Sequence, residues 1–231
     1  MTARTINISC ILSPEWILDF LSEIVFSEKA QILTNQAQAE AFAKESSLDI
    51  DDIRKSYQGD PDAYKRLIER HQQQISKIMW RFSRDPLVHE ELIQDVFVEA
   101  YFSFSKYQNR APFIHWLTKI ATRVGYHYWK EQSRQRKLKK FSFEDWDQLV
   151  SESPEELNPG QAGDLLHMLL SQLPPRDRLV LTLRYLEGCD VAEVARRIGW
   201  TKSMVKVQAN RAKKKLEKLL NQMKKRLFYE E

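Results

Sequence analysis

The sequence has few of the residues that build sulfur-based or glycine-based sites. Only two of its 231 residues are cysteines, and Cys10 and Cys189 lie far apart, so neither a disulfide framework nor a cysteine metal site is expected. This cysteine usage is typical of a reducing cytoplasm. The apolar run at 16–26 is interrupted by Asp19 and Glu23, which argues against a signal peptide. No stretch approaches the roughly 18 apolar residues of a membrane-spanning helix.

Patterns for catalysis and metal binding are also scarce. The five histidines are scattered, and none forms the i, i+4 pair that binds zinc; they are His71, His89, His115, His127 and His167. The chain has no HxE motif, no CxxC motif and no Gly-rich phosphate loop. We therefore expect no catalytic residue, no metal and no cofactor.

Charge is abundant and unevenly distributed, although the net charge is only +4. Residues 1–60 hold ten acids and five bases, and residues 141–164 hold seven acids and no base. Residues 110–140 hold nine bases and one acid, and residues 196–226 hold twelve bases and one acid. Two basic blocks separated by an acidic segment predict two contacts on one polyanion.

Apolar residues recur at helical spacing along most of the chain, and no strand-like alternation occurs, so the predicted fold class is all-α. Ser13 with Pro14, Asp60 with Pro61 and Asp85 with Pro86 are typical helix starts. The expected helices span about 13–26, 30–44, 61–79, 87–101 and 112–136, with a polar loop at 107–112.

Composition divides the chain into two small helical domains joined by an acidic flexible linker. The linker contains Pro154, Pro159, Gly160 and Gly163. We expect a helical extension of unknown role at 1–50, a first domain at 51–140, the linker at 141–164 and a helix-turn-helix domain at 165–226. The extension could be a docking module, a regulatory arm, or the product of a start codon assigned too far upstream.

The segment Leu173–Leu220 is typical of a helix-turn-helix that reads duplex DNA. Ala195, Gly199 and Val205 have the spacing that packs a small residue at a helix crossing and allows a left-handed turn at the glycine. Thr201 is placed to cap the last helix. Cations follow on its outward face, as in a helix that enters a major groove between phosphates. The alternative is a solvated basic helix in an ordinary bundle.

The other basic block lies on the helix expected at 112–136. Five of its polar residues fall within about one quadrant of the helix, at 100° per residue; they are Lys119, Arg123, Tyr126, Lys130 and Arg134. Trp116 and Trp129 border this face, and the loop from Tyr107 to Arg110 precedes it. Cations beside aromatic rings are suited to single-stranded DNA. Alternatively, the aromatics belong to the core and the cations are only solvated.

Together these motifs resemble bacterial sigma factors of the extracytoplasmic-function group, over about 53–140 and 165–220. The resemblance rests on motifs in a fixed order: Gly59-Asp60, Glu91 to Phe97, Phe113-x2-Trp116-Leu117-x2-Ile120-Ala121, and Leu173-Pro174-Pro175-Arg176-x-Arg178-x-Val180. Members of this group keep only the second and fourth sigma domains. They are not enzymes; they act in the cytoplasm, bind RNA polymerase core, direct it to promoters and help to melt the −10 region.

The resemblance also implies site residues and partners. Docking on the coiled coil of the largest polymerase subunit falls to Glu91, Gln94 and Asp95. Contacts to −10 DNA fall to Tyr107, Asn109, Arg110, Lys119, Arg123, Tyr126, His127 and Lys130. Contacts to the −35 duplex fall to Thr201, Lys202, Ser203, Lys206, Gln208, Arg211, Lys213 and Lys214, with Gln208 able to read adenine. An anti-sigma factor is a common further partner, and no membrane insertion is implied.

The chain departs from the family pattern at three positions. Arg123 stands where Asn is frequent, and His127 lies near a usual Asp or Asn, which leaves the preferred −10 bases open. Trp200 replaces a small aliphatic residue and is expected to pack in the core.

Two alternatives to a sigma factor are a stand-alone regulator and a nucleic-acid enzyme. The segment Glu91–Phe97 and the basic block at 110–140 have no use in a plain regulator, and the catalytic motifs of an enzyme are missing.

Overall fold

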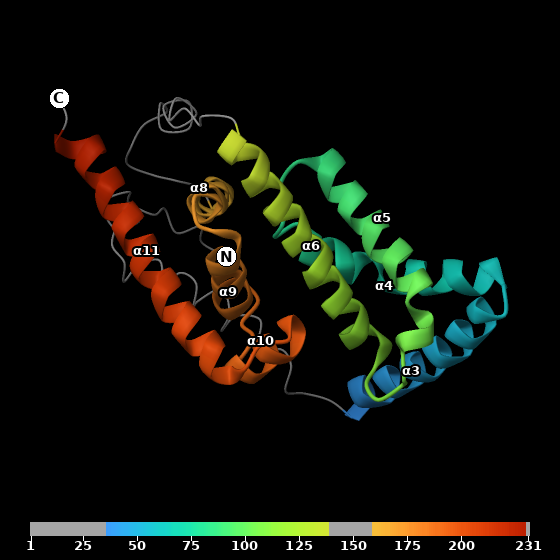
Figure 1. Cartoon of the computed structure of the whole chain (residues 1–231). Helices are drawn as coiled ribbons and strands as arrows, with labels where there is room; N and C mark the ends of the chain where they lie inside the picture. Colours follow the sequence, from blue (N-terminus) through green and yellow to red (C-terminus); the bar gives the residue numbers. More distant parts are fainter. Residues whose placement is uncertain (1–35, 139–158, 230–231) are drawn as a thin grey trace. The chain divides into compact units, whose positions relative to one another are not determined.

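The structure is a computed structural model that describes the backbone of residues 36–138 and 159–229 (Figure 1) and the side chains of 47–135 and 163–222. Within these ranges every regular element is helical, which confirms the all-α class. None of these helices combines the length and apolar character needed to cross a bilayer. The helix expected at 13–26 and most of the expected linker lie outside the described residues.

The described residues form two compact units, one ending at Trp129 and one made of the residues that follow it. The first unit is built from α3 (Gln36–Tyr57), α4 (Pro61–Met79), α5 (Pro86–Phe102), the short 3-10 turn η1 (Phe104–Lys106) and most of α6 (Phe113–Leu138). The second contains α8 (Pro159–Ser171), α9 (Pro175–Leu181), the π-helical turn η3 (Thr182–Leu186), α10 (Val191–Ile198) and α11 (Lys202–Tyr229).

Two aspartate–proline pairs begin α4 and α5 of the first unit, as expected. The Asp60 carboxylate accepts hydrogen bonds from the amides of Asp62 (2.9 Å) and Ala63 (3.2 Å). Asp85 does the same at α5, at 2.9 and 3.2 Å. Because these amides have no partner within the helix, each cap stabilises its helix by about 1 kcal/mol. The starts of α4 and α5 are therefore set by local sequence.

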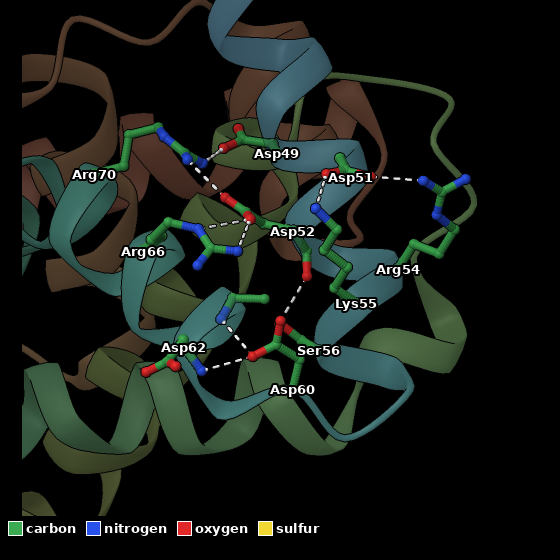
Figure 2. Close-up of polar contacts among 11 residues, drawn as sticks. Asp49, Asp51, Asp52, Arg54, Lys55, Ser56, Asp60, Asp62, Arg66 and Arg70 are labelled. Atoms are coloured by element: carbon green, nitrogen blue, oxygen red, sulfur yellow. Dashed lines mark hydrogen bonds and ion pairs between the residues drawn. The ribbon is translucent and has the colours of Figure 1, made fainter.

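An ion network built on the buried carboxylates of Asp49 and Asp52 joins α3 to α4 (Figure 2). Arg66 donates to the carboxylate of Asp52 at 2.9 and 2.7 Å, and Arg70 donates to Asp52 at 2.7 Å and also to Asp49. His71 Nε2 lies 3.0 Å from each Asp49 oxygen.

Because α3 runs without a break from Gln36 to Tyr57, it crosses the boundary that we expected at residue 50.

The core of the first unit closes around Phe82, which lies between α4 and α5. Its ring packs on Trp129 of α6 with centroids 4.4 Å apart, and the Trp129 indole donates to the Phe82 carbonyl at 2.8 Å. Gly125 of α6 lies directly against the Phe82 ring, where an added methyl group would overlap with it. The contact requires a residue without a side chain.

The second unit has a leucine-rich core between α8, α9 and α11. Its buried members include Leu169, Leu173, Leu181, Ala212, Leu216 and Leu220. α8 begins at Pro159, inside the segment that we expected to be linker up to residue 164. Proline is compatible with the first turn of a helix, because the amide that it lacks has no partner there.

The helix-turn-helix follows the predicted spacing. Asp190 caps α10 by accepting from the amide of Glu193 at 2.7 Å. Gly199 ends α10 in the left-handed region with φ of 74°, and Thr201 Oγ1 accepts from the amide of Met204 at 3.2 Å. Ala195 and Val205 are buried. The turn, the cap and the packing residues are confirmed.

Candidate nucleic-acid interfaces

The loop before α6 is held in shape by Tyr107. Its hydroxyl donates to the carbonyl of Ala111 at 2.8 Å and to the side chain of Asn109 at 3.3 Å. Its ring lies 5.6 Å from that of Phe113 and 5.4 Å from that of Trp116. Burial raises the pKa of the Tyr107 phenol further above neutral pH, and the charge of Asp49 adds to the shift.

This contact leaves the tip of the loop facing solvent. Asn109 is exposed with a positive φ of 52°, a conformation that Asn tolerates better than most residues, and the neighbouring Arg110 is also exposed. The loop therefore presents an amide and a guanidinium at a site next to aromatic rings. These groups are suited to hold an unstacked base.

The predicted basic face of α6 is present and solvent-facing. Lys119, Arg123, His127 and Lys130 are exposed, and Tyr126 is half-buried among them. The two tryptophans take different positions: Trp116 is half-buried beside the loop, whereas Trp129 is 2% exposed and belongs to the core. Trp129 therefore does not border the face, contrary to our expectation.

Sequence reasoning missed that Arg123 has an acidic neighbour. The Arg123 guanidinium forms an ion pair with Glu99 of α5, 24 residues earlier in the chain. The pair is partly exposed, with 52% of the Arg123 side chain accessible. An anion approaching this face therefore competes with Glu99 for Arg123.

On α11, most of the predicted DNA contacts face solvent. Thr201, Lys202, Ser203, Lys206, Arg211 and Lys214 are exposed, and Lys213 is half-buried. Trp200 is half-buried, with the Arg176 guanidinium 4.6 Å above its ring. The N-terminal half of α11 therefore presents a cationic surface.

Gln208 differs from the other predicted contacts. It is half-buried and donates to the carboxylate of Asp177 on α9, which is 1% exposed. Lys215, two turns further along α11, binds the other oxygen of Asp177 at 2.5 Å. Because residues seven apart lie on one helix face, both side chains face α9. The Gln208 amide is therefore already hydrogen-bonded, on the side of α11 that faces α9.

The polar stripe predicted on α5 lies beside a groove. Glu91, Gln94 and Asp95 are exposed, and Gln94 lines the groove of about 1030 Å³ between α4 and α5. The groove also carries Val98 and Phe102, which are 54% and 78% exposed. Sequence reasoning missed these two residues, although their i, i+4 spacing away from the core face was a usable signal.

Models of two known protein regions match the chain. The model of sigma-70 region 2 matches residues 67–135, and the model of sigma-70 region 4 matches residues 163–216. Together they span more than half of the sequence. The chain belongs to the sigma-70 family.

Curated relatives place this sigma factor in the extracytoplasmic-function group. It is 26% identical to the ECF RNA polymerase sigma factor SigX of Bacillus subtilis over 177 residues, which cover 74% of this chain and 90% of SigX. It is 28% identical to the RNA polymerase sigma factor CarQ of Myxococcus xanthus over 166 residues, which cover 71% of this chain and 93% of CarQ. The chain also resembles the solved structure of CnrH in complex with the cytosolic domain of CnrY. The similarity covers 77% of this chain and 97% of the chain in that structure, at 20% identity and a TM-score of 0.49.

Proposed function

We propose that this sigma factor binds the core of RNA polymerase through α5, captures −10 DNA with the first helical unit and binds −35 duplex with α11. The observation that carries the proposal is that one chain contains both a region 2 and a region 4. Its role is to position polymerase on promoters rather than to catalyse a reaction, and we expect it to act in the cytoplasm.

The −10 assignment is supported by the combination of loop and basic face. Tyr107 shapes the loop, Asn109 and Arg110 stand at its tip, and Lys119 and Lys130 lie along α6. Base–aromatic stacking and phosphate neutralisation together stabilise single-stranded DNA, and neither requires a base-paired partner. This surface is therefore suited to hold a strand as the duplex opens.

The docking assignment is supported by the chemistry of the α4–α5 groove. An acidic and amide stripe at Glu91, Gln94 and Asp95 is complementary to basic helices of a partner. The exposed Val98 and Phe102 add apolar area of the kind that interface cores bury. We therefore place polymerase docking on the stripe together with these two residues.

The decisive experiment is reconstituted transcription. Purified chain with core polymerase should initiate at specific promoters, whereas neither component alone should do so. Specific duplex binding without any effect on core polymerase would instead support a stand-alone regulator. The same mixture can be tested with candidate anti-sigma proteins, which remain a predicted class of partner.

The docking stripe gives a sharper prediction. Replacing Gln94 and Asp95 together with alanine should weaken core binding by about 1–3 kcal/mol, because both side chains are exposed and predicted to pair with the partner. Core affinity is measured by titration of labelled chain. Replacing Glu69 and Gln74 of α4 with alanine provides a control, because both are exposed and neither lines the groove. Unchanged core affinity of the Gln94/Asp95 variant would disprove the site.

A further inference from the structure

A strip of four exposed residues runs along the outward face of α11. They are Ser203, Val207, Asn210 and Lys214, at successive spacings of four, three and four residues. This spacing follows one face of a helix. The opposite face carries Val205, Ala212, Leu216 and Leu220, all buried. The strip is therefore the part of α11 turned furthest from its own core.

Val207 is an unusual member of this strip. It is apolar and 50% exposed, between the cations Lys206 and Arg211. It contributes little to the core, since the packing positions of α11 lie on the other side. Asn210, one turn further, is exposed as well.

The contacts of Asp177 show which side of α11 faces α9. This buried carboxylate binds Gln208 and Lys215, which lie two turns apart on one side of the helix. Both hydrogen-bond partners therefore turn the same face of α11 towards α9. As a result, the Gln208 amide is directed inward, while Val207 and Asn210 are directed outward.

We propose that Val207 and Asn210 are the base-specificity residues of the −35 contact, that Asn210 selects adenine and Val207 selects thymine, and that Gln208 reads no base. This inference rests on the proposed −35 role of α11. The Asn210 amide has the donor and acceptor needed for N7 and N6 of adenine, and the Val207 methyl groups match the C5-methyl of thymine.

The neighbouring cations complete this arrangement. Lys206 and Arg211 flank the strip and supply phosphate contacts, which position the helix without selecting sequence. Val207 and Asn210 are three residues apart, so they are separated by about 4.5 Å along the axis. This distance is close to the roughly 3.4 Å between base pairs, so the two contacts fall on neighbouring pairs.

The test is a selection from duplex DNA with a randomised segment, using the full chain bound to core polymerase. The variants are Asn210→Ala, Val207→Ser and Gln208→Ala. Asn221→Ala is the matched control, because Asn221 is exposed on the same face of α11 but lies about 16 Å further along the axis. Thermal unfolding of each variant confirms that it is folded.

Asn210→Ala should reduce the preference for adenine at one −35 position by about tenfold, the effect of losing a bidentate contact. Val207→Ser should reduce the preference for thymine at an adjacent position by about fivefold, because an apolar contact is weaker. Gln208→Ala and Asn221→Ala should select the wild-type motif.

Selection of the wild-type motif by both Asn210→Ala and Val207→Ser would overturn the inference, and so would loss of a base preference in Gln208→Ala. Either result leaves the proposed function intact if the wild type selects a motif and initiates from it. Failure of the wild type to select any motif with core polymerase would instead refute the proposed function.

Discussion

At the scale of single residues, the ion pair between Arg123 and Glu99 bears on the proposed −10 contact of the first unit. Arg123, which is predicted to bind the −10 strand, already pairs with Glu99. Binding of the strand would therefore exchange the Glu99 carboxylate for a DNA phosphate. Exposed ion pairs contribute about 0–1 kcal/mol, so we expect Glu99 to weaken the proposed −10 contact without abolishing it.

Glu99→Gln should therefore raise the affinity for a single-stranded −10 oligonucleotide by up to about fivefold at low salt, with core polymerase present. The gain should fall as salt is added, because phosphate contacts are screened. Fluorescence anisotropy measures both effects. Glu69→Gln, which removes an exposed pair with Lys65 on α4, is the control. Equal affinities for Glu99→Gln and wild type would show that Arg123 does not contact the strand.

At the scale of elements, two contacts hold the helices of the first unit together. Gly125 of α6 packs directly against the Phe82 ring, which leaves no room for a side chain. The ion network connects α3 to α4. Each makes a prediction about stability that is independent of DNA.

Gly125→Ala should destabilise the protein by about 1–3 kcal/mol, since the added methyl group overpacks the Phe82 ring. This loss outweighs the better helix propensity of alanine, which is worth about 1 kcal/mol. Urea denaturation gives the free energy of unfolding. Adding Phe82→Leu should recover part of the loss, because the two positions are in contact. A Gly125→Ala protein as stable as wild type would show that the contact is loose.

The ion network predicts a dependence of stability on pH. Burial alone would raise the pKa of Asp52, but hydrogen bonds from Arg66 and Arg70 outweigh it and hold the pKa below its ordinary value. Since the folded pKa is the lower one, this stabilisation is complete above the unfolded pKa and is lost as pH falls through the folded pKa.

Asp52→Asn should lower the free energy of unfolding at pH 7 by about 1.5–3 kcal/mol. The loss should begin to shrink below about pH 4, the ordinary range of a carboxyl pKa, and disappear only below the lower folded pKa, where the native wild-type carboxylate is protonated too. Urea denaturation from pH 7 to pH 3 measures it. Asp51→Asn, at an exposed pair, should change stability far less. A constant difference between Asp52→Asn and wild type across this range would contradict the prediction.

At the scale of the whole molecule, the two units should bind different forms of DNA. Arg211→Ala should weaken binding of −35 duplexes about equally for every sequence and reduce the salt slope by about 1, because Arg211 is assigned to a phosphate contact. It should not affect binding of a single-stranded −10 oligonucleotide. Lys119→Ala should have the opposite pattern. Both are measured with the full chain bound to core polymerase. If each variant weakened both ligands equally, the assignment of the two surfaces would be wrong.

The parts of this molecule that local sequence determines were predictable. The caps at Asp60, Asp85 and Thr201 and the turn at Gly199 involve neighbours within a few residues, and each was confirmed. The inward turn of Gln208 was not predictable, because its partner Asp177 is 31 residues away in the chain.

The core position of Trp129 and the pairing of Arg123 with Glu99 are likewise set by tertiary contacts, across 47 and 24 residues. Helical periodicity identified the basic face of α6 but could not show what packs against its edges.

The contacts between Asp177 and α11 also bear on how the promoter preference of such a protein can change. Since the two partners of Asp177 lie on the side of α11 that faces α9, we expect exchanges at Val207 and Asn210 to leave the docking of the helix unchanged. If Val207 and Asn210 select the bases as proposed, promoter preference can change by substitutions at two surface positions, at little cost in stability. The residues that orient the helix and those that select the sequence are then separate.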